Sequence, residues 1–301
     1  MGSSSKLYLL GDLSGNIWEP FACTASFQVL QLVESAITKP HHPCHGAMTG
    51  GLPDFLGIGV QKGGTTTLQR LLEQHPGACL PAAKELHYFS LHYGQGEDWY
   101  RQHFAGAASS QRRGEITPYY LFHPAAPQRI RALLPQVKLV VLLRDPVERA
   151  LSQYFHSVRL GLEPLALEPA LAAEEERLAG AEPALQAADG RHSSHQEHSY
   201  LARSRYERQL PAWEALFPSE QLLVLRSEDF FRSPAQLWPQ LLCFLGLERC
   251  ALPPLERPAN AGRGEAAAVP VATRRKLRAQ LECTYQWAAQ RYGIGWDDQH
   301  N

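Results

Sequence analysis

The sequence predicts a three-layer α/β fold, in which helices cover both faces of a central parallel sheet. Short apolar runs at residues 55–60, 138–143 and 221–225 are typical of strands, and residues 138–143 form the near-continuous run expected of a strand buried on both faces. Helix-like segments follow these runs along the chain. That alternation favours a parallel sheet between helical layers. The first strand leads into a glycine-rich turn, which indicates a P-loop-like anion-binding loop.

Composition and charge limit the function classes. The chain has 301 residues, enough for one large domain or two small ones, and its net charge of −1 gives no general attraction to nucleic acid or to a membrane. The longest aliphatic run, residues 139–143, is too short to cross a bilayer, so we expect no stable membrane insertion. The N-terminus lacks the pattern of a signal peptide. The 6 cysteines are scattered without CxxC spacing, and we expect reduced thiols and a cytoplasmic location.

Residues 1–50 form an N-terminal extension whose structure the sequence does not define. Within it, His41, His42, Cys44 and His45 lie close together. Neighbouring prolines and glycines indicate a loop, and a metal site needs three or four convergent ligands. We therefore expect no bound metal.

The stretch from residue 55 to residue 74 predicts an anion-binding site. Residues 61–65 carry two glycines that allow tight turns, and residues 66–74 have the pattern of a helix with three leucines on one face. Free N–H groups at a helix start and the helix dipole favour a negative ligand. Lys62 adds a mobile cation, and Thr65 and Thr66 add hydroxyl donors. On the loop alone, a glycine turn without a ligand stays open as the alternative.

The next segments contain a candidate general base. Residues 77–80 read as a short extended segment, and residues 94–104 have the aromatic spacing of a short helix. Between them, Glu85 and His87 are two residues apart, so they point to the same side if the chain is extended there. A Glu–His pair can take a proton from a reacting group. The alternative is a solvated turn followed by aromatic core residues.

A second candidate binding segment follows the central strand. Residues 114–120 read as a turn or short strand, and residues 124–134 as a helix. Arg144 comes directly after the strand at residues 138–143, at the carboxyl end where open α/β sheets bind ligands. Ser152 lies in the helix predicted over residues 147–156. A structural ion pair between Arg144 and Asp145 is the alternative.

The C-terminal half predicts further helices around one more strand. Residues 163–198 indicate a helix or two with a loop, and residues 200–217 one amphipathic helix. After the strand at residues 221–225, Ser233 and Pro234 have the pattern of a helix start, and Gly246 that of its end. Residues 253–271 read as a loop, and residues 273–292 as one last helix.

Two of these segments, taken together, resemble one enzyme family. Residues 58–66, Ile-Gly-Val-Gln-Lys-Gly-Gly-Thr-Thr, resemble the loop that holds the 5′-phosphosulfate of PAPS (3′-phosphoadenosine 5′-phosphosulfate) in sulfotransferases. Residues 142–154 resemble that family's 3′-phosphate segment, and residues 84–89 also match. The resemblance is greatest to the heparan sulfate 3-O/N-sulfotransferase type and its bacterial relatives. It covers residues 54–301, which it identifies as a sulfotransferase domain.

The resemblance implies a site, position by position. Lys62 would stabilise the leaving phosphate, while Gly63, Gly64, Thr65 and Thr66 would cradle the 5′-phosphosulfate. Arg144 and Ser152 would hold the 3′-phosphate, and Arg263 would close over the cofactor. Glu85 would be the catalytic base, with His87 beside it. The implied reaction is in-line sulfuryl transfer from PAPS to a hydroxyl or amine of a small-molecule or glycan acceptor, with PAP as product and without a metal.

Departures from the family pattern leave the acceptor and other functions open. Ser90 stands where the animal 3-O enzymes have an acidic residue, and Ile116 stands where they have a lysine. No dense basic patch for a long polyanion is visible. A P-loop kinase of a small metabolite is one alternative, although Lys62 does not directly precede the magnesium-binding Ser/Thr of G-x-x-x-x-G-K-[ST]. A non-catalytic nucleotide-binding protein is the other. The sequence does not indicate the oligomeric state.

Overall fold

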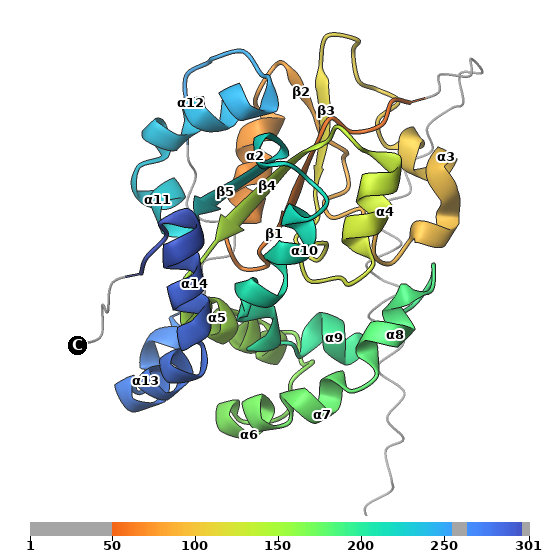
Figure 1. Cartoon of the computed structure of the whole chain (residues 1–301). Coiled ribbons are helices and arrows are strands. Elements are labelled where there is room, and N and C mark those ends of the chain that lie inside the picture. The colour runs from red at the N-terminus through yellow and green to blue at the C-terminus, as the bar shows by residue number, and fades with distance from the viewer. Residues whose placement is uncertain (1–49, 255–263, 297–301) are drawn as a thin grey trace, which may run out of the picture. The chain divides into compact units, whose positions relative to one another are not determined.

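A computed structural model describes residues 50–254 and 264–296 of the chain (Figure 1). The predicted extension up to residue 49 and the candidate residue Arg263 lie outside the described residues. The five strands of the sheet run parallel in the order β2-β3-β1-β4-β5. Their bounds are β1 Phe55–Gly59, β2 Ala78–Cys79, β3 Arg112–Ile116, β4 Lys138–Leu143 and β5 Leu222–Arg226. The predicted α/β class and parallel sheet are confirmed.

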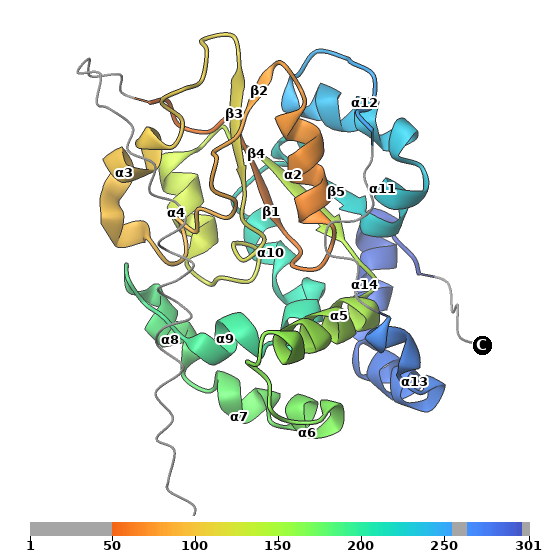
Figure 2. The ribbon, with the colours of Figure 1, turned by 180° about the vertical axis from the view of Figure 1, so that it is seen from behind.

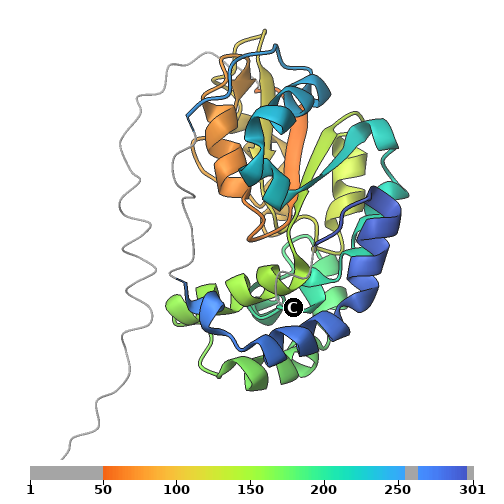
Figure 3. The same cartoon turned by 90° about the vertical axis from the view of Figure 1, so that its left-hand side faces the viewer.

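Helices cover both faces of this sheet because its central strands are apolar on both sides. Along β4, Leu139 and Val141 pack into one hydrophobic cluster, and Val140 and Leu142 into a second. The second cluster holds α2 (Thr65–Glu73), α11 (Ser227–Arg232) and α12 (Pro234–Leu245), which Figure 2 shows in front of the sheet. The other face is covered by α4 (Ala126–Leu133) and α10 (Leu210–Glu214), as Figure 3 shows edge-on.

A group of helices lies beyond the carboxyl ends of the strands (Figure 1). It begins with α5 (Pro146–Arg159), which Asp145 caps by accepting a hydrogen bond of 2.9 Å from the Glu148 N–H. The segment predicted to hold a helix or two has four short ones: α6 Leu167–Ala172, α7 Glu174–Leu178, α8 Ala181–Gln186 and α9 Ser193–Glu197. None of the helices in residues 50–254 and 264–296 has the length and apolar character that a membrane span requires. The remaining helical elements are η1 Tyr93–Gln95, α3 Gly96–Gln102, η4 Ser219–Gln221 and η5 Glu265–Ala268.

Two predicted helices are each broken in the structure. The segment 200–217 forms two 3-10 turns, η2 (Ala202–Ser204) and η3 (Tyr206–Arg208), before α10. Pro211 has no N–H to continue a helix through this segment, and the buried Arg203 and Ser204 side chains bind other parts of the chain. The segment 273–292 forms α13 (Val271–Gln280) and α14 (Glu282–Tyr292), which meet at the buried Leu281. The break lets both helices bury an apolar face against the same core.

The end of α12 is as predicted. Gly246 follows its last residue in the left-handed conformation, at φ 66°. Its N–H donates to the helix carbonyl groups, which is the usual role of glycine at this position.

Candidate active site

The predicted anion-binding loop connects β1 to α2 at the carboxyl edge of the sheet. Two of its residues adopt left-handed backbone conformations, Lys62 with φ 70° and Gly64 with φ 94°. The carbonyl of Gly64 accepts the first hydrogen bonds of α2, from the N–H groups of Thr67 and Leu68. The N–H groups before these have no acceptor within the helix, because a helix start lacks a preceding turn. Thr65 and Thr66 supply these groups, and both residues line a cavity.

The pKa of Lys62 is lowered by burial and by neighbouring positive charges. Burial disfavours the charged ammonium, and the nearby Arg159, Arg144 and Arg149 add to this effect. Together they lower the pKa of Lys62 from 10.5 to about 8. An anion in the cavity would reverse this balance, because an opposite charge favours the charged form.

Arg144 connects the second predicted segment to the first. It follows β4, and its guanidinium donates a hydrogen bond of 3.0 Å to the carbonyl oxygen of Lys62. Tyr206 donates to the Arg144 carbonyl oxygen at 2.7 Å, which fixes the turn between β4 and α5. Asp145 instead binds the Tyr285 hydroxyl at 3.0 Å and caps α5. Among the described residues Arg144 and Asp145 form no ion pair, so the structural ion-pair alternative is wrong.

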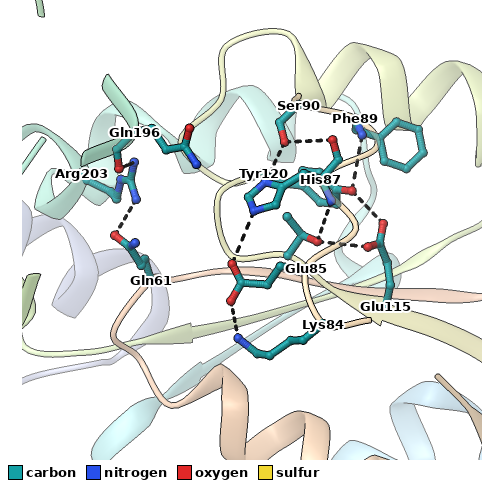
Figure 4. A network of polar contacts seen from close by, with 11 residues as sticks. Gln61, Lys84, Glu85, His87, Phe89, Ser90, Glu115, Tyr120, Gln196 and Arg203 are labelled. Carbon is teal, nitrogen blue, oxygen red and sulfur yellow. Dashed lines mark hydrogen bonds and ion pairs between the residues drawn. The ribbon is translucent and has the colours of Figure 1, made fainter. Parts of the chain in front are cut away.

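The candidate base lies in a loop with unusual backbone geometry. Glu85 and His87 have φ values of 59° and 53°, so this segment is not extended. The two side chains still meet, with 3.6 Å between Glu85 Oε2 and His87 Nε2, because the turns bring them to the same side (Figure 4). Lys84 contacts the other carboxylate oxygen. Burial alone would raise the pKa of Glu85, but His87 and Lys84 outweigh it and lower the pKa to about 2.

His87 is itself held by the residue that departs from the family pattern. Its Nδ1 lies 3.1 Å from the Ser90 hydroxyl, on the side of the ring away from Glu85 (Figure 4). The backbone carbonyl of His87 accepts hydrogen bonds from the N–H groups of Ser90, Leu91 and His92. These hydrogen bonds close the chain into a tight turn directly after the candidate base.

One cavity brings most of the predicted site residues together. It has a volume of about 680 Å³ and is lined by Lys62, Gly64, Thr65, Thr66, Glu85, Arg144 and Ser152. Gly63, in the same loop, does not line the cavity, and an added Cβ there would approach the Leu142 carbonyl oxygen to 2.6 Å. His87 does not line the cavity and lies behind Glu85.

The cavity has further walls that the sequence motifs did not indicate. Phe155, His156 and Arg159 continue the face of α5 that carries Ser152, at the helical spacing that could have revealed them. Phe231 on α11 is 37% exposed and packs near Gly64, where an added Cβ would lie 2.6 Å from the ring. An exposed aromatic ring beside a phosphate-type loop offers a stacking surface for a flat ligand group.

A second cavity, of about 730 Å³, lies beside the first and shares Glu148, Glu228 and Arg232 with it. Its walls come mainly from α13, α14 and the start of α5, and no predicted site residue lines it. Within the described ranges, no three His, Cys, Asp or Glu side chains are grouped as a metal site would need.

Comparisons with known proteins agree with this arrangement. The sulfotransferase domain model matches residues 52–252. The membrane-associated sulfotransferase kil1 of Dictyostelium discoideum is 42% identical over 111 residues, which are 36% of this chain and 24% of that protein. Heparan sulfate glucosamine 3-O-sulfotransferase 3B1 of Mus musculus is 32% identical over 208 residues, 68% of this chain and 48% of that protein. The chain thus spans about half the length, or less, of these curated relatives.

A solved structure extends the similarity to the fold. The crystal structure of a sulfotransferase from Alicyclobacillus acidocaldarius has 29% sequence identity and a TM-score of 0.60. The match covers 77% of this chain and 95% of that one.

Proposed function

Because this chain belongs to the sulfotransferase family, we propose that it transfers a sulfuryl group from PAPS to a hydroxyl or amine of a carbohydrate acceptor and releases PAP. One observation carries the proposal: the Lys62 loop, Arg144, Ser152 and Glu85 line a single cavity. The two anion-binding segments suit the 5′-phosphosulfate and the 3′-phosphate of one nucleotide. The carboxylate suits a base that takes the proton of the acceptor. The family match supports the reaction class.

The groups around the cavity fit a nucleotide with two anionic ends. Lys62 and Arg144 provide cations, and arginine binds phosphate well because its donors form a planar fork. Gly64 and the start of α2 provide the backbone conformation and the N–H groups that cradle phosphate at other helix starts. Phe231 lines the same cavity, and its ring would stack on the adenine.

The proposed reaction is an in-line displacement at sulfur. The acceptor oxygen or nitrogen forms a bond to sulfur, while the bond between sulfur and the bridging oxygen breaks and its electron pair stays on the leaving phosphate. Lys62 stabilises that developing charge, and Glu85 takes the proton of the acceptor. His87 orients Glu85 through their 3.6 Å contact. As in phosphoryl transfer, positioning and charge stabilisation supply most of the catalysis.

The acceptor class rests on the relatives. Several are named as heparan sulfate glucosamine 3-O-sulfotransferases, which supports a glycan acceptor for this chain. A cytoplasmic location stays a prediction from the sequence.

A transfer assay with mass-spectrometric detection tests the proposal. The protein is incubated with PAPS and a panel of glycans, amino sugars and small alcohols, and we expect an 80 Da gain on a sugar acceptor with release of PAP. A thermal-shift comparison separates the alternatives, because a sulfotransferase is stabilised by PAP and a P-loop kinase by ATP with magnesium. Stabilisation by PAP without transfer to any acceptor would favour a non-catalytic nucleotide-binding protein.

A further inference from the structure

Glu115 is a fully buried carboxylate that lies behind the candidate base. It belongs to β3, and its side chain accepts three hydrogen bonds: from Tyr100 at 2.6 Å, from Tyr120 at 2.8 Å and from Thr117 at 3.0 Å. Among the described residues, no lysine or arginine forms an ion pair with it. Burial raises the pKa of Glu115, and the three hydroxyl donors oppose that rise. A buried carboxylate is costly unless it is satisfied, so this network has a structural reason to exist.

Two of the three hydroxyls also hold the loop that carries Glu85. The Thr117 oxygen accepts a hydrogen bond from the His87 N–H, and the Tyr120 oxygen accepts one from the Phe89 N–H, each at 3.4 Å. Figure 4 shows Glu115 to the right of His87, with Gln61 on the opposite side of the view. The third hydroxyl, on Tyr100, donates to the carboxylate and forms no hydrogen bond with the loop backbone among the described residues.

The carboxylate fixes which way these hydroxyls point. A hydroxyl has one proton, and Thr117 and Tyr120 each direct it to Glu115. Their oxygens therefore present lone pairs to the two loop amides. Both hydrogen bonds from the loop N–H groups are long, so each is weak. They act together on a backbone that has positive φ at two non-glycine residues. Non-glycine residues at positive φ persist only where the surroundings hold them, as Glu85 and His87 must be held here.

We infer that Glu115 is a positioning residue for the candidate base: through the hydroxyls of Thr117 and Tyr120 it fixes the backbone of residues 85–89, and so the direction of the Glu85 carboxylate. The inference rests on the proposed function, since it takes Glu85 as the base. It assigns a role to a buried acid that does not touch the cavity. The network is local to the base and does not reach the Lys62 loop, so nucleotide binding should not depend on it.

A matched pair of variants separates positioning from general stability. Tyr120→Phe and Tyr100→Phe each remove one hydroxyl from the same carboxylate oxygen, and both rings are fully buried. Only Tyr120 also accepts from the loop. We expect both variants to lower Tm to a similar extent. For Tyr120→Phe we expect kcat to fall by about 10- to 100-fold, since a displacement of about 1 Å can cost that much, while KM for PAPS stays unchanged. Tyr100→Phe should keep its kcat.

Thr117 offers a rescue experiment. Thr117→Val removes the hydroxyl and should lower kcat, whereas Thr117→Ser keeps it and should restore most of the turnover. Glu115→Gln should also lower kcat, because its amide nitrogen replaces one of the two acceptor oxygens and at least one of the Thr117 and Tyr120 hydroxyls then loses its acceptor. Equal losses of kcat in Tyr100→Phe and Tyr120→Phe, or no loss in either, would overturn the inference.

Hydrogen exchange tests the same idea without relying on activity. We expect the peptide that contains His87 and Phe89 to exchange faster in Tyr120→Phe and Thr117→Val than in the wild type, and at the wild-type rate in Tyr100→Phe. Unchanged exchange in all three variants would refute the positioning role even if transfer is observed. If the wild-type protein transfers no sulfuryl group, the proposed function fails, and the exchange result still decides whether Glu115 fixes the loop.

Discussion

Arg144 donates a hydrogen bond of 3.0 Å from its guanidinium to the backbone carbonyl of Lys62. The two residues come from separate motifs that follow β1 and β4, which are neighbouring strands of the sheet. Because parallel strands end at the same edge, the turns that follow them lie side by side. A residue expected to hold the 3′-phosphate thus also supports the loop expected to hold the phosphosulfate.

Removing Arg144 should weaken nucleotide binding in a ligand-specific way. Arg144→Ala deletes a cation and its charge-assisted hydrogen bonds, which are each worth about 1.5–3 kcal/mol, so we expect Kd for PAP to rise by about 10- to 100-fold. Adenosine 5′-phosphosulfate lacks the 3′-phosphate and should lose less affinity. Calorimetric titration with both ligands measures the difference. Ser152→Ala, which leaves the tether to Lys62 intact, should cause a smaller loss confined to PAP. Equal losses for both ligands would show that Arg144 does not bind the 3′-phosphate.

The lowered pKa of Lys62 predicts how binding changes with pH. In the free protein this pKa is about 8, so the ammonium loses its proton as the pH rises through that value. An anion binds the charged form, and we expect PAP affinity to fall above about pH 8, by up to about tenfold per pH unit. In Lys62→Arg the cation stays charged, so this pH dependence should disappear. The measurement is Kd for PAP between pH 6.5 and 10, and the same slope in both proteins would contradict the assignment.

The lowered pKa of Lys62 affects folding stability in the opposite direction from PAP binding: stability rises with pH where binding falls. Between pH 8 and the ordinary lysine value of 10.5, the unfolded chain binds the proton that folded Lys62 has lost. Stability from this group therefore rises with pH in that window. Weaker PAP binding at high pH cannot then be attributed to unfolding caused by Lys62.

The sheet could be predicted because its strands are encoded locally. The strand at residues 138–143 has the same bounds in the structure, since a run that is apolar on both faces has few other ways to be buried. The helix break at residues 200–217 could not be predicted by periodicity. Arg203 binds the Gln61 side chain, and Ser204 binds the Pro146 carbonyl, both far away in the sequence. Such long-range polar contacts override a local helical pattern.

The candidate site also has residues that the sequence could predict and residues that only the folded structure reveals. Lys62, Gly64 and Arg144 stand in motifs with a fixed relation to strand ends, so the sequence could place them at one edge of the sheet. Their roles in binding stay predictions. Phe231 comes from α11, a segment with no motif, and only the packing of that helix against the loop brings its ring to the cavity. Likewise, Glu115 reads as an ordinary polar residue until its three hydroxyl partners are known.

Gly64 should tolerate no side chain. Its φ of 94° disfavours any other residue, and an added Cβ would lie 2.6 Å from the Phe231 ring. Gly180→Ala is the matched control, because Gly180 has φ 75° and open space around it. The left-handed backbone alone should cost about 1–2 kcal/mol at either position. We expect Gly64→Ala to lower Tm further than Gly180→Ala and to weaken PAP binding, which Gly180→Ala should leave intact. Thermal unfolding with and without PAP measures both effects.

Glu85→Gln should separate binding from turnover. The amide keeps the size of the carboxylate but cannot take a proton, so we expect kcat to fall by about 10²–10⁴-fold with Kd for PAP unchanged. The pKa of Glu85 is about 2, below the ordinary 4.5, so the stability that its ionisation contributes is present above pH 4.5 and is lost only as the pH falls through about 2. Glu85 is therefore ionised throughout pH 5–8, and the deficit of the variant should be constant over that range. Glu97→Gln, at a surface glutamate paired with Arg101, is the control and should keep full turnover. Wild-type kcat in Glu85→Gln would exclude Glu85 as the base.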